Sequence, residues 1–294
     1  MCGFVAIVAR PNVGKSTLMN KIIGQKIAIT TPTAQTTRTQ IRGIFTDSDS
    51  QIIFIDTPGV HKPLNKLGEC LSEHTKNALD GCDLIIFLTD GSEPAGRGDA
   101  WIVENYLKSA KAPILCVLNK VDLIKDLAQR EVNVYTYKKL FEPENIQTLK
   151  VSAKTGRNID NLLDNIKKHL PAGEKLYPED EVCDQSMRNI AAEIVREKII
   201  LNTGDEIPHA VAVLVENYEE SETIDKICAK IFVSTESQKG ILIGKSGSML
   251  KKVGTQARLE LEKIVGKKVF LELFVKVQKN WQKDENAIKM LGLK

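Results

Sequence analysis

Short apolar runs alternate with amphipathic segments through the first 171 residues of the chain. The runs have the length of buried strands, and the segments between them carry apolar residues at helical spacing. This alternation predicts a doubly wound, mostly parallel α/β sheet, and the short polar link at residues 47–50 predicts an antiparallel hairpin within it. The expected strands are residues 4–8, 41–46, 51–55, 84–89, 114–118 and 148–151, and the expected helices are residues 68–77, 97–109, 132–141 and 159–169.

The pattern changes after residue 171. Residues 172–182 have no clear period and become acidic, so we expect a linker there. Residues 183–278 then read as helix, strand, strand, helix, helix and strand, which predicts a smaller α+β domain, and residues 279–294 are expected to be a C-terminal tail. The main segments of this domain are residues 187–201, 209–216, 224–234, 249–264 and 269–277.

Composition adds limits to this organisation. The chain has 294 residues, enough for two domains, and its 42% hydrophobic and 27% charged residues are ordinary for a globular protein. No apolar run approaches the roughly 18 residues that read as a transmembrane helix. The 6 cysteines form no C-x-x-C pair, which argues against a structural metal or disulfide framework. We therefore expect a cytoplasmic protein.

The strongest local motif lies between the first strand and the helix that follows it. Backbone N–H groups of such a loop wrap phosphate oxygens, and the helix N-terminus favours negative charge. Lys15 is expected to reach the outer phosphates and to assist catalysis, and the Ser16 hydroxyl to bind Mg²⁺. Ala9 replaces the usual first glycine and fits if its φ is negative; a chance strand–turn–helix corner is the alternative. The predicted phosphate-binding residues are Ala9, Arg10, Pro11, Asn12, Val13, Gly14, Lys15, Ser16 and Thr17.

A second motif follows the third expected strand, at the carboxyl end where doubly wound sheets bind ligands. Asp56 is placed to hold Mg²⁺ through a coordinated water, and the Gly59 N–H to meet a terminal phosphate. On its own this is a common turn, but its position after a phosphate loop favours the nucleotide function. The predicted nucleotide-binding residues of this motif are Asp56, Thr57, Pro58, Gly59 and Val60.

Two more motifs at strand ends point to guanine. The Asp122 carboxylate can accept both N1–H and N2–H of guanine, a donor pair that adenine lacks. Asn119 would tie this loop to the phosphate loop, and the Lys120 stem would cover one face of the base. In the last motif, Ser152-Ala153-Lys154, the Ala153 N–H is expected at guanine O6. Either motif alone could be a surface turn, but their order and spacing argue against coincidence.

With these motifs, the first 170 residues resemble GTPases of the translation-factor class. The resemblance implies GTP and GDP as ligands, with Mg²⁺ as cofactor. It also implies a switch hydroxyl that binds Mg²⁺, which we assign to Thr37, with Thr36 second. Val60 stands where Ras-type GTPases carry the glutamine that orients the attacking water. Because valine cannot hydrogen-bond a water, we expect slow intrinsic hydrolysis, or dependence on another group or a partner.

Asn12 is the candidate helper in hydrolysis. Related GTPases with asparagine at this loop position can use a bound K⁺ to offset phosphate charge. The alternative is that Asn12 only braces the loop. Turnover in K⁺ and in Na⁺ distinguishes the two.

The charge along the second half changes sign. Residues 181–236 carry 5 basic and 12 acidic residues, whereas residues 237–294 carry 13 basic and 5 acidic ones. One basic surface indicates a polyanionic partner. Within it lies a G-x-x-G loop between helical stretches, which in KH modules clamps a single-stranded nucleic-acid backbone; a plain helix–helix turn is the alternative. The predicted RNA-binding residues are Gly244, Lys245, Ser246, Gly247, Lys251, Lys252 and Arg258.

The order of elements around this loop resembles a type II KH domain, and nearly the whole chain resembles the Era-type family of bacterial GTPases. Residues 207–210 (I-P-H-A) and 271–277 (L-E-L-F-V-K-V) carry the resemblance further. It implies a monomer that binds the 3′ region of 16S rRNA and acts in assembly of the 30S ribosomal subunit. Peripheral association with the inner face of the cell membrane is also known in the family, although no amphipathic anchor stands out. The rival hypothesis is a GTP-dependent scaffold that binds a membrane or protein.

Overall fold

The chain forms two compact units. The computed structural model describes residues 1–31, 41–60, 62–63, 65–142, 146–204 and 207–293. The first unit is built from residues up to Asp184, and the second is mainly Gln185–Lys294. Each unit has its own hydrophobic core.

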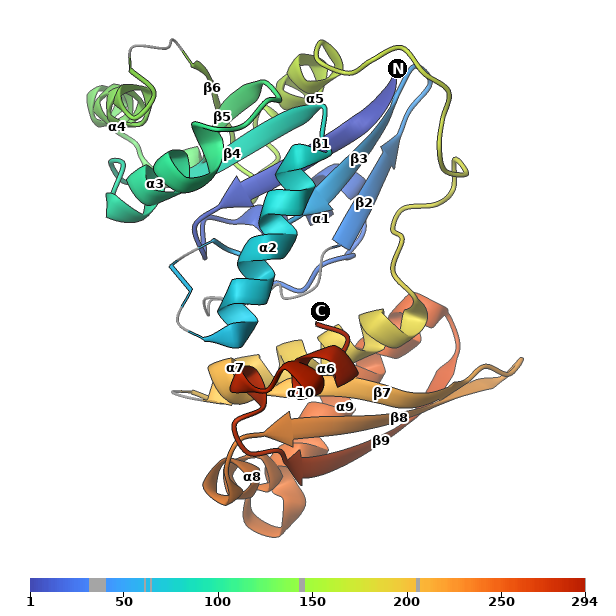
Figure 1. Cartoon of the computed structure of the whole chain (residues 1–294). Coiled ribbons are helices and arrows are strands. Elements are labelled where there is room, and N and C mark those ends of the chain that lie inside the picture. The colour runs from blue at the N-terminus through green and yellow to red at the C-terminus, as the bar shows by residue number, and fades with distance from the viewer. Residues whose placement is uncertain (32–40, 61, 64, 143–145, 205–206, 294) are drawn as a thin grey trace. The chain divides into compact units, whose positions relative to one another are not determined.

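The described residues of the first unit form a six-stranded sheet with the strand order β2-β3-β1-β4-β5-β6 (Figure 1). Each neighbouring pair is parallel except β2 and β3, which form the antiparallel hairpin predicted from the short link between them. The prediction of a mostly parallel sheet is thereby confirmed. The strands are β1 (Cys2–Ala9), β2 (Ile41–Thr46), β3 (Gln51–Asp56), β4 (Leu84–Asp90), β5 (Ile114–Asn119) and β6 (Gln147–Lys150).

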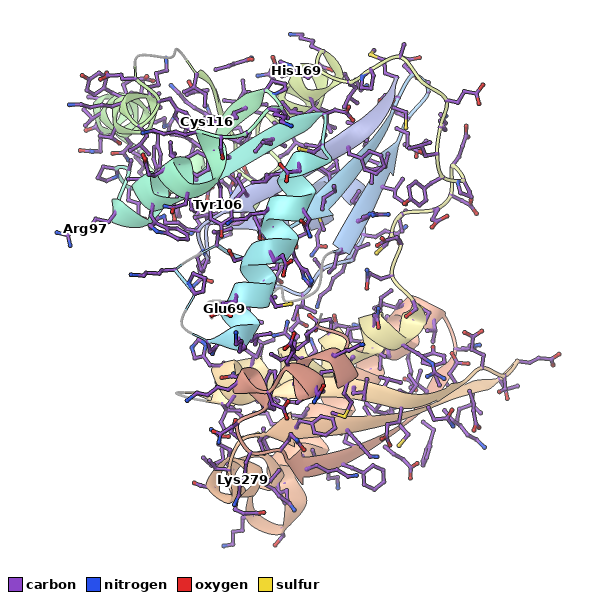
Figure 2. The ribbon with its side chains drawn as sticks, viewed as in Figure 1. Glu69, Arg97, Tyr106, Cys116, His169 and Lys279 are labelled. Carbon is purple, nitrogen blue, oxygen red and sulfur yellow. The ribbon has the colours of Figure 1, made fainter. Side chains whose placement is uncertain are left out.

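Helices pack on both faces of this sheet, as a doubly wound fold requires. Leu18 and Leu162 join the core on one face, whereas Ile102 and Tyr137 join the core on the other. Tyr106, labelled in Figure 2, lies beside helix α2, and its hydroxyl is 2.6 Å from Ser72 Oγ. The helices are α1 (Lys15–Ile23), α2 (Lys66–Asp80), α3 (Arg97–Ile102), the π-helix η1 (Val103–Leu107), the 3₁₀ turn η2 (Val121–Leu123), α4 (Leu127–Lys139) and α5 (Ile159–Lys167).

The second unit is a three-stranded sheet with helices packed on one face. β7 and β8 are antiparallel, and β8 and β9 are parallel, in the order β7-β8-β9. The predicted type II KH order of elements is confirmed. The elements are α6 (Met187–Asn202), α7 (Ile207–Ala210), β7 (Ala212–Glu219), β8 (Ile224–Val233), α8 (Glu236–Ile243), the 3₁₀ turn η3 (Lys245–Gly247), α9 (Ser248–Val265), β9 (Lys268–Val277), the 3₁₀ turn η4 (Trp281–Lys283) and α10 (Glu285–Met290).

The prediction of a strand over residues 209–216 is wrong at its start. Residues Ile207–Ala210 form a short helical turn, and the strand begins only at Ala212. Pro208 stands in the first turn of this helix, a position that suits proline because the N–H it lacks would have no partner there.

Residues 172–184, most of which we predicted to be a linker, lie along strands β2 and β3. Gln51 is fully buried, and its Oε1 accepts hydrogen bonds from the backbone N–H groups of Leu176 (2.7 Å) and Tyr177 (2.9 Å). Farther on, the Ile44 N–H donates to the Val182 carbonyl at 2.9 Å, and Gly43 pairs with Cys183. This stretch therefore packs as part of the first unit.

The last residues, predicted to be a tail, join the second unit. Trp281 is fully buried, and its indole N–H donates to the Ala210 carbonyl at 2.8 Å. Leu291 and Leu293 are also buried. An indole buried with its N–H satisfied contributes both apolar burial and a fixed orientation.

Candidate nucleotide site and nucleic-acid groove

The phosphate loop connects the end of β1 to the start of α1. Ala9 is fully buried. Because it is the last residue of β1, its backbone is extended, and alanine in place of glycine causes no strain there. Gly14 is different, because its φ is +97° and a Cβ there would lie 2.4 Å from Asn119 Nδ2. The loop therefore tolerates alanine at its first motif position but requires glycine before Lys15.

Lys15 and Asp56 form an ion pair inside this site. Lys15 is 7% exposed and Asp56 is fully buried. The ammonium donates to Asp56 Oδ1 and also to the Thr57 carbonyl. Two groups predicted to bind phosphate and Mg²⁺ are thus in contact, and a nucleotide with its metal would have to separate them.

The residues expected to hold Mg²⁺ suit that ion. Ser16 is the second residue of α1, and Asp56 ends strand β3. They offer one hydroxyl and one carboxylate, and Mg²⁺ in nucleotide sites usually takes one or two protein ligands with phosphate oxygens and water. The third expected ligand, Thr37, and its neighbour Thr36 lie outside the described residues.

Residues 57–60 lie against the phosphate loop. A Cβ at Gly59 would be 3.3 Å from Pro11 Cα, and the Val60 N–H donates to the Ala9 carbonyl at 2.9 Å. The Thr57 hydroxyl donates to the Ile7 carbonyl at 2.7 Å. The Val60 side chain is 5% exposed and packs in the hydrophobic core, so it has no means of orienting a water.

Asn119 joins three loops of the site. It is 2% exposed, and its Nδ2 donates to the Val13 carbonyl at 2.9 Å. Its Oδ1 accepts the Ala153 N–H at 2.9 Å. The amide that we expected at guanine O6 is therefore engaged by Asn119 in this structure, because the turn at Ser152 brings it within reach of that side chain.

Asp122 is oriented by Ser152. The Ser152 hydroxyl, which is fully buried, donates to Asp122 Oδ1 at 2.6 Å. This contact fixes the plane of the carboxylate. A fixed carboxylate in the 3₁₀ turn η2, just after β5, can accept a pair of parallel N–H donors, such as those on one edge of guanine.

Lys120 links the guanine loop to the phosphate loop. Its φ is +60°, and its ammonium donates to the Asn12 carbonyl and to Asp90 Oδ2, both at 2.7 Å. Burial raises the pKa of Asp90, but hydrogen bonds from Lys120 and Ser92 outweigh it and hold that pKa below its usual value. Sequence reasoning missed Asp90, although a carboxylate at the end of β4 was a visible signal.

Arg10 turns away from the loop in which it lies. Its Nε donates to Asp99 Oδ1 at 2.7 Å, and Nη2 donates to Glu93 Oε1 at 2.7 Å. Asp99 is fully buried and also accepts the Gly96 N–H at the start of α3. Arg10 thus fixes the loop backbone with its side chain, and Asp99 is a supporting residue that the sequence did not indicate.

The G-x-x-G loop of the second unit has backbone angles that its glycines permit. Gly244 has φ +71°, and a Cβ there would lie 2.9 Å from the Met249 backbone nitrogen. Gly247 has φ +78° with open space around it, and Ser246 between them has φ +52°. Lys245 and Ser246 are exposed. The loop presents the Ser246 hydroxyl and the Lys245 ammonium group to solvent.

A groove of about 340 Å³ runs from this loop along α9 and β9. Three leucines line it, and Lys251 and Arg258 add positive charge. Arg258 also donates to Glu262 at 2.9 Å. Lys252, which we predicted with them, is exposed but does not line the groove. The lining residues are Gly247, Leu250, Lys251, Gly254, Thr255, Arg258, Leu271 and Leu273.

In a comparison with known protein families, two family models match this chain. Residues 4–120 match the model described as 50S ribosome-binding GTPase, and residues 206–282 match the KH domain model. Within the described ranges, no helix is both long and apolar enough to cross a membrane.

Full-length relatives are similar over both units. GTPase Era of Nostoc sp. strain PCC 7120 is 46% identical over 290 residues, which cover 99% of this chain and 89% of the relative. A crystal structure of an Aquifex aeolicus Era variant bound to GDP·AlF₄⁻ has a TM-score of 0.95 at 38% identity, covering 99% of each chain. A structure of Era with MgGDPNP and nucleotides 1506–1542 of 16S rRNA has a TM-score of 0.96 at 38% identity, covering 99% of this chain and 98% of that one. The chain therefore belongs to the Era family of GTPases, in which a GTPase domain is followed by a KH domain.

Proposed function

We propose that this protein is a GTP-driven switch that binds the 3′ region of 16S rRNA and acts in assembly of the 30S subunit. The observation that carries the proposal is one chain with both a guanine-nucleotide site and a G-x-x-G groove with cationic walls. A solved relative of 38% identity carries MgGDPNP together with 16S rRNA nucleotides, which supports the same pairing of ligands here. In this reading residues 1–171 do the nucleotide chemistry and residues 183–278 bind RNA, in a cytoplasmic monomer.

The nucleotide-binding roles follow from the contacts in the site. Lys15 would exchange Asp56 and the Thr57 carbonyl for phosphate oxygens, and Asp56 with Ser16 would hold Mg²⁺. Bound Mg²⁺ supplies positive charge that offsets the charge of the phosphates. The predicted switch ligand Thr37 belongs to the same proposal.

At the base end, Asp122 would accept guanine N1–H and N2–H. Because the Ala153 N–H is engaged by Asn119, the Lys154 N–H, which has no hydrogen bond among the described residues, is the amide we assign to guanine O6. The other predicted residues of the four motifs surround these groups.

Potassium is expected to speed GTP hydrolysis through Asn12. Its φ is +65°, and its carbonyl already accepts Lys120, so the loop holds the side chain at an exposed position beside the phosphate site. We expect turnover to be about tenfold higher in K⁺ than in Na⁺ at equal ionic strength, because a K⁺ held by Asn12 would place positive charge beside the phosphates in the transition state. Steady-state phosphate release measures the ratio.

Asn12→Gly is the informative variant for this test, since glycine adopts a positive φ without strain and removes only the side chain. The ratio between K⁺ and Na⁺ should fall to about one in this variant. Equal rates for the parent protein in both ions would refute the K⁺ role and leave Asn12 as a brace for the loop.

Gly247→Asp is expected to lower affinity for a single-stranded RNA from the 3′ end of 16S rRNA about tenfold or more, because a carboxylate would face the phosphate backbone. No atom lies within 4 Å of a Cβ at Gly247, although its φ of +78° would strain any side chain, whereas a side chain at Gly244 would also collide with Met249. Aspartate is among the residues that tolerate this conformation, so the fold should survive. Fluorescence anisotropy measures the affinity, and Gly266→Asp is the matched control, because Gly266 also has a positive φ (+71°) and open space for a Cβ.

The same variant tests the rival function at a membrane or protein surface. If Gly247→Asp leaves RNA affinity unchanged and instead weakens binding to anionic vesicles, the membrane reading replaces ours. Steep loss of RNA affinity with rising salt supports phosphate contact.

A further inference from the structure

One face of the second unit's sheet is left open by the described helices. α6, α8 and α9 pack against the face that carries Ile227, Ile231 and Val269 in the core. Figure 1 shows α9 behind β8 and β9. Successive residues of a strand point to opposite faces, so the alternate residues of β9, with Lys226 and Lys230 of β8, form an open face. The end of β8 at Phe232 is buried and is not part of this face.

Two phenylalanines stand out on this face. Phe270 is 50% exposed and Phe274 is 49% exposed, and the other described phenylalanines are at least partly buried. Both lie on β9, and cross-strand pairing places Phe270 opposite Lys226 and Phe274 opposite Lys230. The strand rise of ~3.3 Å per residue puts the two rings about 13 Å apart, too far to stack on each other.

The charged residues around the rings favour an anion. Lys226 and Lys276 are exposed on this face, and Lys230 pairs with Glu216 of β7. Lys230 lies close enough to Lys276 to lower the pKa of the Lys276 ammonium group. A phosphate between these two ammonium groups would relieve their repulsion. Glu272, between the rings, is the one carboxylate that β9 places on this face.

We propose that this open sheet face, defined by Lys226, Lys230, Phe270, Glu272, Phe274 and Lys276, is a second single-stranded RNA site on which two bases stack. Aromatic side chains on a sheet face, flanked by basic residues, bind single strands in this way in other folds. Glu272 would accept a base amino group between them.

The new surface lies on the other side of β9 from the candidate groove. Leu271 and Leu273 line that groove, whereas Phe270 and Phe274 alternate with them on the opposite face of the same edge strand. An RNA longer than the roughly four nucleotides that a KH groove clamps could pass around β9 and reach the rings. The choice of RNA as ligand rests on the proposed function of this protein. The residues of the open sheet face and those that line the candidate groove are different.

The test compares two RNAs from the 3′ end of 16S rRNA, one of about six and one of about sixteen nucleotides, with the full chain. Phe270→Ala/Phe274→Ala should lower affinity for the longer RNA by about tenfold per ring and leave the shorter one unchanged. Phe270→Tyr/Phe274→Tyr should restore it. Tyr135→Ala is the control, because Tyr135 is a 60% exposed aromatic residue of the first unit.

A second variant guards against a folding defect. Lys226→Gln/Lys276→Gln should reduce the salt dependence of binding for the longer RNA only. Ultraviolet crosslinking of the longer RNA should map to Phe270 and Phe274. Failure of the parent protein to bind the shorter RNA would count against the groove alone, whereas unchanged affinity of the double alanine variant for the longer RNA would overturn the second site.

Discussion

Asp122→Asn is expected to lower GTP affinity roughly a hundred- to ten-thousand-fold and to favour xanthosine triphosphate. The variant replaces one acceptor oxygen by an NH₂ group that faces the guanine donors, and hydrogen bonds to a charged acceptor are worth about 1.5–3 kcal/mol each. Xanthine carries a carbonyl where guanine has its 2-amino group, so the new amide donor would be satisfied. Calorimetric titration with both nucleotides measures the exchange of preference.

Asp126→Asn is the matched control for this change. Asp126 caps helix α4 by accepting the Ala128 N–H, and asparagine caps equally well. The Asp126→Asn variant should therefore bind GTP with the affinity of the parent protein. Undiminished guanine selectivity in the Asp122 variant would mean that the base is read elsewhere.

Lys15→Met is expected to reduce GTP affinity more than a hundredfold and also to destabilise the nucleotide-free protein by about 3–5 kcal/mol, the scale of removing the cation from a buried ion pair. The second effect follows from the contact with Asp56, which is fully buried. Urea unfolding without nucleotide measures the stability, and nucleotide titration measures the affinity.

The double variant Lys15→Met/Asp56→Asn separates the two roles of the lysine. Removing both charges should recover most of the lost free energy of unfolding, since the buried carboxylate is replaced by a neutral amide, while GTP affinity stays low. If the single variant were as stable as the parent, the ion pair with Asp56 would contribute nothing to the nucleotide-free state.

Local chemistry explains why so much was predictable from the sequence. Buried strands and the loops at their carboxyl ends are encoded by short contiguous patterns, so β1, β3 and β5 and the motifs that follow them could be located without coordinates. The G-x-x-G loop was recognisable for the same reason, because its positive φ angles call for glycine.

What escaped prediction depends on residues far apart in the chain. Arg10 donates to Asp99, which lies 89 residues farther along the chain, and the Ala153 N–H donates to Asn119, which lies 34 residues earlier. No local period encodes such pairs. A distant contact also explains why residues 172–184, most of which we predicted to be a linker, pack on the first unit. The Gln51 side chain accepts hydrogen bonds from the backbone amides of Leu176 and Tyr177.

Residues 172–184, which lie along β2, also determine how the GTPase domain could be isolated. β2 is the edge strand of the sheet, and an uncovered edge offers unpaired backbone groups to other chains. Residues 176–183 cover that edge through the Gly43–Cys183 pairing and the Ile44–Val182 hydrogen bond. A fragment that ends at residue 171 would leave β2 uncovered and prone to aggregate, whereas one that ends after Asp184 would keep the segment that covers this edge.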